Sequence, residues 1–308
     1  YATGQPSACA VGEFLLGRVL DGIGRPMDGK STFPDGAQTR PLMSAPPDPL
    51  TRSAIITPTP VGIRAIDGFL TLGQGQRVGL FAGSGVGKST LLGQITRQTV
   101  ADVCVVCLVG ERGRELRAFI DENLEEKGLS KSVVVCATSD SPPLMRLKSA
   151  QTATTIAEYF RDQGKSVLLI VDSVTRYARA LREIGLARGE LPARRGFPAS
   201  VFADLPRLLE RTGNSSRGSI TAIYSVLVEG DDLQEPIADE VRGIVDGHIV
   251  LDRQLAAQSH WPAINVLQSL SRLMNSISSA QHIAAANHVR QLLAHYEENK
   301  DSISFGTY

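Results

Sequence analysis

The sequence predicts an α/β fold in which helices flank both faces of a mostly parallel sheet. Three observations support this prediction. From about residue 50, apolar runs rich in Val, Ile and Leu alternate with helical stretches, which is typical of such a sheet. One run, residues 78–81, leads directly into a glycine-rich loop at 82–89. Another run, residues 168–171, ends in the carboxylate of Asp172, at the end of a parallel strand where ligands bind.

Length and composition are those of an ordinary globular protein. The 308 residues allow one large domain with appendages, and a hydrophobic content of 42% is enough for a real core. Because 32 basic and 32 acidic residues cancel, a nucleic-acid-binding protein is disfavoured. No apolar run approaches the roughly 20 residues that span a bilayer, and the first residues do not form a signal-peptide pattern. The missing initiator Met favours a fragment or a processed chain.

The four cysteines do not form a disulfide framework in a chain of this length. Cys104 and Cys107 have the spacing of a redox or zinc motif, but both lie in the apolar run 103–109. On an extended strand their side chains would point to opposite faces. We therefore expect buried small hydrophobic residues rather than a metal or redox site, and a cytoplasmic location.

The first part of the chain differs in composition from the rest. Residues 13–50 are rich in Gly, Pro and Asp, with short extended pieces such as 13–20, and 41–49 form a Pro-rich connector. These features predict hairpins or the trailing edge of a β-rich domain. We assign residues 1–45 to the end of such an N-terminal domain with its connector.

Residues 46–272 carry the alternating pattern and form the predicted core domain. The expected strands are residues 77–81, 103–109, 132–137, 167–172, 218–228 and 248–251, and the expected helices lie near 88–99, 114–126 and 144–163. From about residue 275 the chain becomes helical, and 302–308 lack a clear pattern. Residues 273–308 are therefore predicted to begin a further, truncated helical domain.

The glycine-rich loop has the sequence AGSGVGKS between a predicted strand and a predicted helix. Glycines let backbone N–H groups approach phosphate oxygens, and the helix N-terminus adds unpaired donors and a positive dipole. Lys88 can reach the β- and γ-phosphates, and the Ser89 hydroxyl can ligate Mg²⁺. One departure from the usual pattern is Ala82, where a glycine is expected. The candidate nucleotide contacts are Gly83, Ser84, Gly85, Val86, Gly87, Lys88, Ser89 and Thr90.

Two strand ends supply candidate acidic residues. Asp172 is placed to hold Mg²⁺ directly or through water. Glu111 follows the strand at 103–109 and could orient an attacking water, as phosphoryl hydrolysis requires. Arg112 beside it could contact the γ-phosphate. The alternative is that 110–114 is a charged loop that caps the next helix, and the residues alone leave both interpretations open.

Several motifs together resemble one known family. They are residues 82–89, 110–115, 168–180, 196–214, 229–251 and 262–272. In this order they are similar to the ATPase of type III protein secretion systems and its flagellar export relative. That family belongs to the hexameric RecA-like group, which includes the subunits of rotary ATP synthases. The similarity covers about residues 11–301, and both Ala82 and the stretch 229–251 resemble the secretion branch.

The resemblance implies a RecA-like P-loop core, the remnant of an N-terminal β-barrel and the start of a C-terminal helical domain. It also implies roles for particular residues. Lys88 matches the lysine that binds phosphate, and Ser89 matches the hydroxyl that ligates magnesium. Glu111 matches the catalytic carboxylate, and Arg112 matches the arginine that contacts the γ-phosphate. Asp172 matches the aspartate that organises magnesium, and Arg272 matches an arginine that reaches a neighbouring subunit's site. Tyr308 is similar in position to an aromatic that packs on adenine, although a surface tyrosine fits equally, and Leu227 offers only an apolar contact.

The function implied is a Mg-dependent ATP hydrolase that energises type III protein export by releasing chaperones and unfolding cargo. It would act as a hexameric ring with shared sites, at the cytoplasmic face of the bacterial inner membrane. The expected partners are a central stalk, peripheral stator proteins and chaperone–effector complexes, but no nucleic acid. This fragment alone is expected to be mainly monomeric.

Three alternatives stay open. The chain could be the catalytic subunit of a rotary ATP synthase or ion pump. It could be a non-catalytic nucleotide-binding ring subunit, although Glu111 argues against that, because a structural subunit needs no water-activating carboxylate. A nucleic-acid translocase is disfavoured by the neutral charge and few aromatics. The basic loop 191–198, with Arg194 and Arg195, is either solvated or directed to a ring pore, and Trp261 is expected to pack in the core or at an edge.

Overall fold

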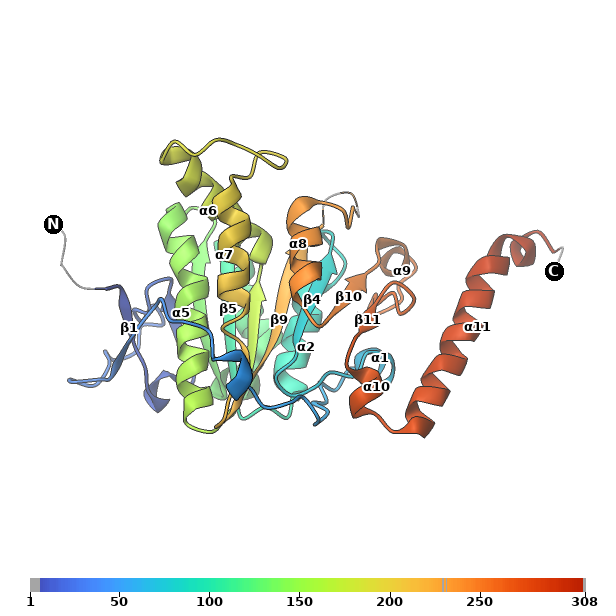
Figure 1. Cartoon of the computed structure of the whole chain (residues 1–308), viewed down its shortest axis with the longest axis horizontal. Coiled ribbons are helices and arrows are strands. Elements are labelled where there is room, and N and C mark those ends of the chain that lie inside the picture. Colours follow the sequence, from blue (N-terminus) through green and yellow to red (C-terminus); the bar gives the residue numbers. More distant parts are fainter. Residues whose placement is uncertain (1–5, 229, 231, 307–308) are drawn as a thin grey trace.

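The predicted α/β architecture is confirmed in the computed structural model, which describes residues 6–228, 230 and 232–306. Within this part of the chain, a nine-stranded sheet has the order β11-β10-β4-β9-β7-β5-β6-β2, with β8 paired to β9. All neighbours in this order are parallel except β10 and β11, and β8 is antiparallel to β9. Figure 1 shows α5, α7 and α8 in front of this sheet.

The strands are β1 Ala8–Ala10, β2 Arg18–Asp21, β3 Thr39–Pro41, β4 Arg77–Ala82, β5 Val103–Glu111, β6 Ser132–Thr138, β7 Ser166–Asp172, β8 Gly213–Asn214, β9 Ser219–Leu227, β10 Gly247–Leu251 and β11 Leu270–Ser271. The α-helices are α1 Arg64–Phe69, α2 Lys88–Gln98, α3 Gly113–Ala118, α4 Glu125–Ser130, α5 Pro143–Asp162, α6 Val174–Ala187, α7 Ala199–Leu209, α8 Pro236–Ile244, α9 Arg253–Ala257, α10 Met274–Ile277 and α11 Ala280–Ser304. Short helical turns are η1 Glu13–Leu15, η2 Pro49–Thr51 and the wider η3 Phe119–Leu124. The six strands expected in the core are all present as β4, β5, β6, β7, β9 and β10.

Each face of the sheet has its own hydrophobic core. On one face, strand side chains pack with α5, α6, α7 and α8, and on the other they pack with α1, α2 and η3. Cys107 belongs to the first core and Cys104 to the second, so the two side chains lie on opposite faces of β5. The prediction that they are buried packing residues is confirmed, and burial raises the pKa of the Cys104 thiol to about 12.

The N-terminal region is built differently from the hairpins that its composition predicts. β1 and β3 do form an antiparallel pair. β2, however, pairs in parallel with β6 and forms an edge of the main sheet. Its residues Val19 and Leu20 are buried, so part of this Gly- and Pro-rich region belongs to the core packing. The domain boundary at residue 45 stays a prediction.

A buried ion pair fastens the connector to the core, and we call it the connector clamp. It consists of Glu158 on α5, Arg211 after α7, Thr155, Ser44 and Leu42. The Arg211 guanidinium donates two hydrogen bonds to the Glu158 carboxylate, at 2.8 and 2.7 Å, and one to the Leu42 carbonyl at 2.8 Å. It also donates to the Thr155 hydroxyl, and Ser44 donates to Glu158 at 2.9 Å. The two charged side chains are 4% and 7% exposed.

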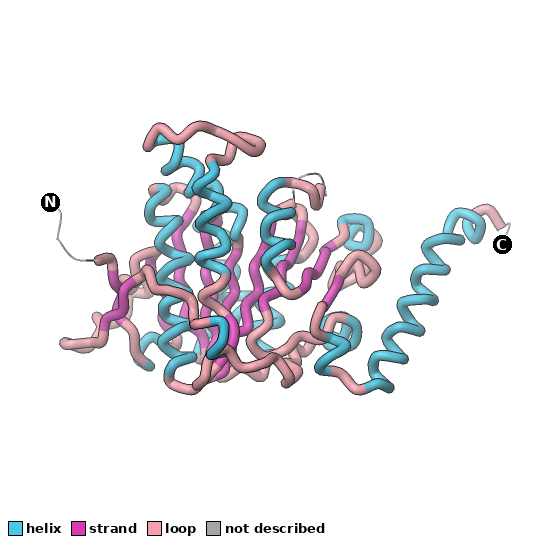
Figure 2. Tube along the Cα trace, in the orientation of Figure 1, coloured by secondary structure: helices cyan, strands magenta, loops and turns pink. Residues whose placement is uncertain are grey.

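The C-terminal helix α11 stands at one end of the molecule, at the right of Figures 1 and 2. It packs against α1 and α10, and Arg290 donates hydrogen bonds to the carbonyls of Phe69 and Val266. The helix continues to Ser304, so the expectation that residues from 302 onward lack a pattern is wrong for the first of them. Among the residues described, no helix combines the length and apolarity that crossing a membrane requires.

Candidate functional site

The candidate site lies where four adjacent parallel strands end. In the order β4-β9-β7-β5, β4 leads into the glycine-rich loop, β7 ends at Asp172 and β5 ends at Glu111. Parallel strands bring their carboxyl ends to one edge of the sheet, and ligands of such sheets bind there. In the register, Asp172 lies beside Leu108 of β5, and Ser225 of β9 lies beside Leu80 of β4. Residues far apart in the sequence thus meet at one edge.

The glycine-rich loop connects β4 to α2 in a geometry that suits an anion. Gly85 and Gly87 have φ values of 79° and 76°, in the left-handed region that other residues rarely adopt. Lys88 is the first residue of α2, so the N–H groups of its first turn have no partner within the helix. Ser89 and Thr90 on this turn are exposed. The loop therefore presents free donors and a positive helix end to solvent.

A cluster of charged side chains lies beside this loop, and we call it the phosphate-site cluster: Lys88, Glu111, Asp172, Arg176 and Ser225. The Lys88 amine contacts Asp172 Oδ1 and lies 3.9 Å from Glu111 Oε1. The Lys88, Glu111 and Asp172 side chains are 11%, 13% and 3% exposed. The sequence prediction that these three residues converge on one place is borne out by this geometry, while their chemical roles stay proposals.

Two members of the cluster were not identified from the sequence. Arg176, on the first turn of α6, forms an ion pair with Glu111. Ser225, fully buried on β9, donates a hydrogen bond of 2.8 Å to Asp172 Oδ1. Arg176 follows the predicted strand end by four residues, so its place on the first helical turn was a usable signal. Ser225 stands in an apolar strand and gave no signal.

A second carboxylate adjoins Glu111. Hydrogen bonding to Glu111, followed by the charges of Arg112 and Arg176, holds the pKa of Glu115 below its usual range. Arg112 itself is the residue that caps α3, and its guanidinium lies 3.6 Å from Glu115. Its side chain is 75% exposed. Arg112 therefore borders the cluster and stands at the N-cap position of α3, where its side chain makes no capping hydrogen bond.

One further candidate residue, Arg272, is not brought to the cluster. Arg272 follows the edge strand β11, is exposed, and donates a weak hydrogen bond to the Arg242 carbonyl at 3.5 Å. This position does not test a role in a neighbouring subunit. Tyr308 lies outside the described residues. Leu227 lies at the end of β9, where its N–H donates to the Thr175 hydroxyl at 2.9 Å.

The basic loop between α6 and α7 is held by acidic partners. Arg194 lies 3.1 Å from Asp239 of α8, and Arg195 lies 3.2 Å from Asp232. Both arginine side chains are more than half exposed, at 52% and 60%. Whether the loop faces a ring pore stays a prediction.

Trp261 was expected to pack in the core or at an edge of the fold. It is 56% exposed, so it does not belong to the core. A Cβ atom added at Gly87 would come within 2.7 Å of the indole ring, so the ring lies directly against the phosphate loop. Together with Thr90, Leu91 and Gln94 of α2, the ring lines a pocket of about 370 Å³. An exposed aromatic ring next to a phosphate loop is suited to stack on a nucleotide base.

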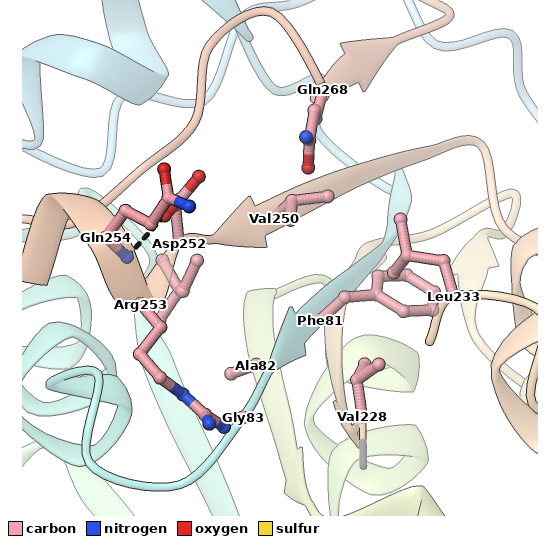
Figure 3. Close-up of a pocket in the computed structure, with 11 residues that line it drawn as sticks. Phe81, Ala82, Gly83, Val228, Leu233, Val250, Asp252, Arg253, Gln254 and Gln268 are labelled. Atoms are coloured by element: carbon pink, nitrogen blue, oxygen red, sulfur yellow. Dashed lines mark hydrogen bonds between the residues drawn. The ribbon is translucent and has the colours of Figure 1, made fainter. Parts of the chain in front are cut away.

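A second pocket, of about 260 Å³, adjoins the start of the loop. Figure 3 shows it around Phe81, Ala82 and Gly83, with the amides of Gln254 and Gln268 at its other end. Asp252 there accepts hydrogen bonds from the backbone N–H groups of Gln254 and Leu255, and the Asn265 amide donates to its other oxygen. Both oxygens of the Asp252 carboxylate are thus engaged within the protein, in contrast to the free donors of the phosphate loop.

The residues present fit both a nucleotide triphosphate and Mg²⁺. The loop offers the unpaired N–H groups and Lys88, while Ser89 and Asp172 supply oxygen atoms, which Mg²⁺ prefers. Mg²⁺ is usually held by one or two such side chains together with phosphates and water. The carboxylates of Asp172 and Glu111 lie next to the Lys88 amine, where phosphate oxygens would bind.

Comparisons with known proteins agree with this site. The nucleotide-binding domain of the ATP synthase alpha/beta family matches residues 62–271, and the C-terminal domain of the type III secretion ATPase EscN matches residues 278–308. The first match covers the glycine-rich loop, Glu111, Asp172 and Trp261.

Named relatives are similar over almost the whole chain. The flagellum-specific ATP synthase of Bacillus subtilis is 57% identical over 307 residues, which are 100% of this chain and 70% of the relative. The type 3 secretion system ATPase of Xanthomonas euvesicatoria is 55% identical, covering 99% of this chain and 69% of the relative. The structure of the assembled ATPase EscN from enteropathogenic E. coli superimposes with a TM-score of 0.94 at 55% identity. This match covers 98% of this chain and 73% of EscN. The chain therefore belongs to the ATP synthase alpha/beta family and, within it, to the ATPases of type III secretion and flagellar export.

Proposed function

We propose that this chain hydrolyses ATP with Mg²⁺ at the phosphate-site cluster and uses the energy to drive protein export. One observation carries the proposal: Lys88, Glu111 and Asp172, from three separate segments, converge beside a free helix N-terminus. This is the donor and acceptor set that phosphoryl transfer to water requires. The similarity to named export ATPases supports the same conclusion.

The chemistry follows from the position of each group. Lys88 and the N–H groups of the loop bind the phosphates and stabilise the negative charge that develops on them. Asp172 and Ser89 would hold Mg²⁺, which would neutralise negative charge on the phosphates. Glu111 lies 3.9 Å from the Lys88 amine, close enough to accept a hydrogen bond from a water beside the terminal phosphate. Arg176 holds the Glu111 carboxylate in place through its ion pair.

The base of the nucleotide is proposed to bind in the Trp261 pocket. The phosphates occupy the N-terminus of α2, and the pocket continues along the same helix past Thr90 to Gln94. Stacking on an aromatic ring places the base without requiring a particular hydrogen-bond pattern. Tyr308, the aromatic suggested by the family resemblance, stays a second candidate.

The active form is proposed to be a ring in which Arg272 completes the site of a neighbouring copy. EscN is described as an assembled ATPase, and another EscN structure, with a TM-score of 0.92, includes its central stalk EscO. By analogy, we propose a stalk protein as a partner of this chain, with action at the cytoplasmic face of the inner membrane. Stator proteins and chaperone–effector complexes are further proposed partners.

The competing functions differ in what they need at this site. A non-catalytic ring subunit needs the loop but not Glu111, whereas here Glu111 is held within 3.9 Å of Lys88 by an ion pair to Arg176. A subunit of a rotary synthase would share the chemistry and differ in its partners. The matches at 53–57% identity are named type 3 secretion system ATPases and a flagellum-specific ATP synthase, which favours export.

Mixing two inactive variants tests the shared site. Lys88→Ala removes the phosphate lysine, and Arg272→Ala removes the arginine proposed to act in trans, so each variant alone should be nearly inactive. In a mixed ring, a subunit with intact Lys88 can receive Arg272 from its Lys88→Ala neighbour, and part of the ATPase activity should return. The wild-type specific activity should also rise with protein concentration. If mixed rings form without any recovery, or if activity is independent of concentration, the shared-site proposal is wrong.

A further inference from the structure

A buried hydroxyl connects the two charged residues at the centre of the site. Ser225 is fully buried on β9, between β4 and β7. Its hydroxyl donates to Asp172 Oδ1 at 2.8 Å and lies 3.4 Å from the Lys88 amine. The neighbouring residues of β9, Tyr224 and Val226, are apolar packing residues in the opposite core. The Ser225 hydroxyl therefore lies on the face of β9 that is directed to the phosphate-site cluster.

We propose that Ser225 is a positioning residue that orients the Asp172 carboxylate for Mg²⁺. This inference rests on the proposed function of the cluster. The Ser225 hydroxyl donates to Oδ1 of Asp172, so Oδ2 would be the oxygen left to bind a metal or its water. Asp172 is 3% exposed, so few water molecules can hold its carboxylate instead.

The hydroxyl has a second effect through Lys88. The Lys88 amine contacts Asp172, and it would leave this contact if it turned to bound phosphates. A carboxylate that loses its cation in a buried place needs another donor, because burial of an unpaired charge is costly. Ser225 is that donor, since its hydrogen bond to Oδ1 does not depend on Lys88. It therefore keeps Asp172 fixed in both states.

The effect to be measured is the gain in nucleotide affinity that Mg²⁺ produces. Ser225 donates a hydrogen bond to a charged group, and a 10-fold effect on affinity corresponds to about 1.4 kcal/mol. Ser225→Ala should therefore reduce the Mg-dependent gain in ADP affinity by about 10-fold. Binding of ADP in EDTA should be unchanged, because the loop and Lys88 remain. Trp261 is the one tryptophan in the sequence and lies against Gly87, so its fluorescence reports occupancy.

Matched variants separate the hydroxyl from the packing of β9. Thr and Val have nearly the same shape, but only Thr carries a hydroxyl, so Ser225→Thr should keep the Mg-dependent gain and Ser225→Val should lose it. A double-mutant cycle tests whether Ser225 acts through Asp172. In an Asp172→Asn background, Ser225→Ala should change the gain by less than about 2-fold.

Each result decides the inference. A hydroxyl-dependent loss of the Mg-dependent gain that disappears in the Asp172→Asn background supports it. The inference is overturned if the wild type and Ser225→Ala show the same Mg-dependent gain in ADP affinity, or if Ser225→Thr and Ser225→Val lose that gain equally. It is also overturned if Ser225→Ala has an undiminished effect on the gain in the Asp172→Asn background. If the wild type itself shows no Mg-dependent change in ADP affinity, the proposed function fails, which is a different outcome. Thermal melting of each variant confirms that the compared proteins are folded.

Discussion

Two charged clusters in this chain contain similar groups but differ in whether their hydrogen-bonding groups are satisfied within the protein. The connector clamp pairs Arg211 with Glu158, and every hydrogen bond of the pair closes within the protein. The phosphate-site cluster pairs Lys88 with Asp172 and Glu111, next to a loop whose backbone donors and Ser89 hydroxyl face solvent. Lys88 and Glu111 are more exposed, at 11% and 13%, than the two clamp side chains at 4% and 7%, whereas Asp172 is 3% exposed.

The difference separates a structural ion pair from a functional one. A buried pair that is fully hydrogen-bonded holds elements together, here the connector, α5 and the end of α7. A cluster with excess acceptors and unpaired donors beside it is arranged for a ligand that supplies the missing partners. Substitutions in the clamp should therefore change stability, and substitutions in the phosphate-site cluster should change binding and turnover.

The largest effect is expected at the clamp. Glu158→Gln keeps the size of the side chain but leaves the buried Arg211 guanidinium without its counter-charge. Breaking a buried pair in this way costs about 3–5 kcal/mol in the free energy of unfolding. Urea unfolding followed by circular dichroism measures the change.

A double variant serves as the control for the clamp. Glu158→Leu with Arg211→Met removes both charges and should recover part of the lost stability, because no unpaired charge remains. A loss below about 1 kcal/mol in Glu158→Gln would mean that the clamp is not the structural pair described here.

The next effect is expected in turnover, at Lys88. Lys88→Met removes a positive charge directed at the phosphates, and removing one such donor typically lowers turnover by about 10²–10³-fold. Steady-state ATPase assays at saturating Mg-ATP measure it. Lys131→Met is the matched control, because Lys131 donates to the carbonyls of Arg97 and Thr99 at the other end of α2. Similar losses in both variants would contradict a specific role for Lys88.

A smaller effect is expected at the Trp261 pocket. Removing an aromatic ring that stacks on a base costs about 1–3 kcal/mol, so Trp261→Ala should weaken ADP binding by roughly 10-fold. Trp261→Phe keeps an aromatic ring and should stay within about 3-fold of the wild type. Calorimetric titration is the suitable measurement, since the fluorescent residue is removed. Unchanged ADP affinity in Trp261→Ala would mean that the nucleotide base does not bind in the Trp261 pocket.

The sequence predicts those parts of the molecule whose signals are local. The loop 82–89, the strand before it and the helix after it form one continuous pattern, and Asp172 marks the end of an apolar run. The position of β2 was not predictable in this way, because its partner β6 lies more than 100 residues away and only tertiary packing selects it. For the same reason the sequence cannot give the strand order that brings Asp172 beside Ser225.

The missed site residues show the same limit. Ser225 is one hydroxyl in an apolar strand, and its partners come from β7 and α2. Trp261 is separated in sequence from the loop that it covers, so the sequence predicted packing in the core or at an edge without identifying this neighbour. In both cases the role of the residue depends on which distant segment packs against it. That neighbour is set by the fold and cannot be read from the local sequence pattern.

The hydrolytic role of Glu111 is the central claim, and Glu111→Gln tests it most directly. The variant keeps the size of the side chain, so Mg-ADP binding measured by Trp261 fluorescence should stay within about 3-fold of the wild type, whereas ATP turnover should fall by about 10²–10⁴-fold, the usual contribution of a general base. Turnover close to the wild-type rate, with nucleotide still bound, would contradict the account.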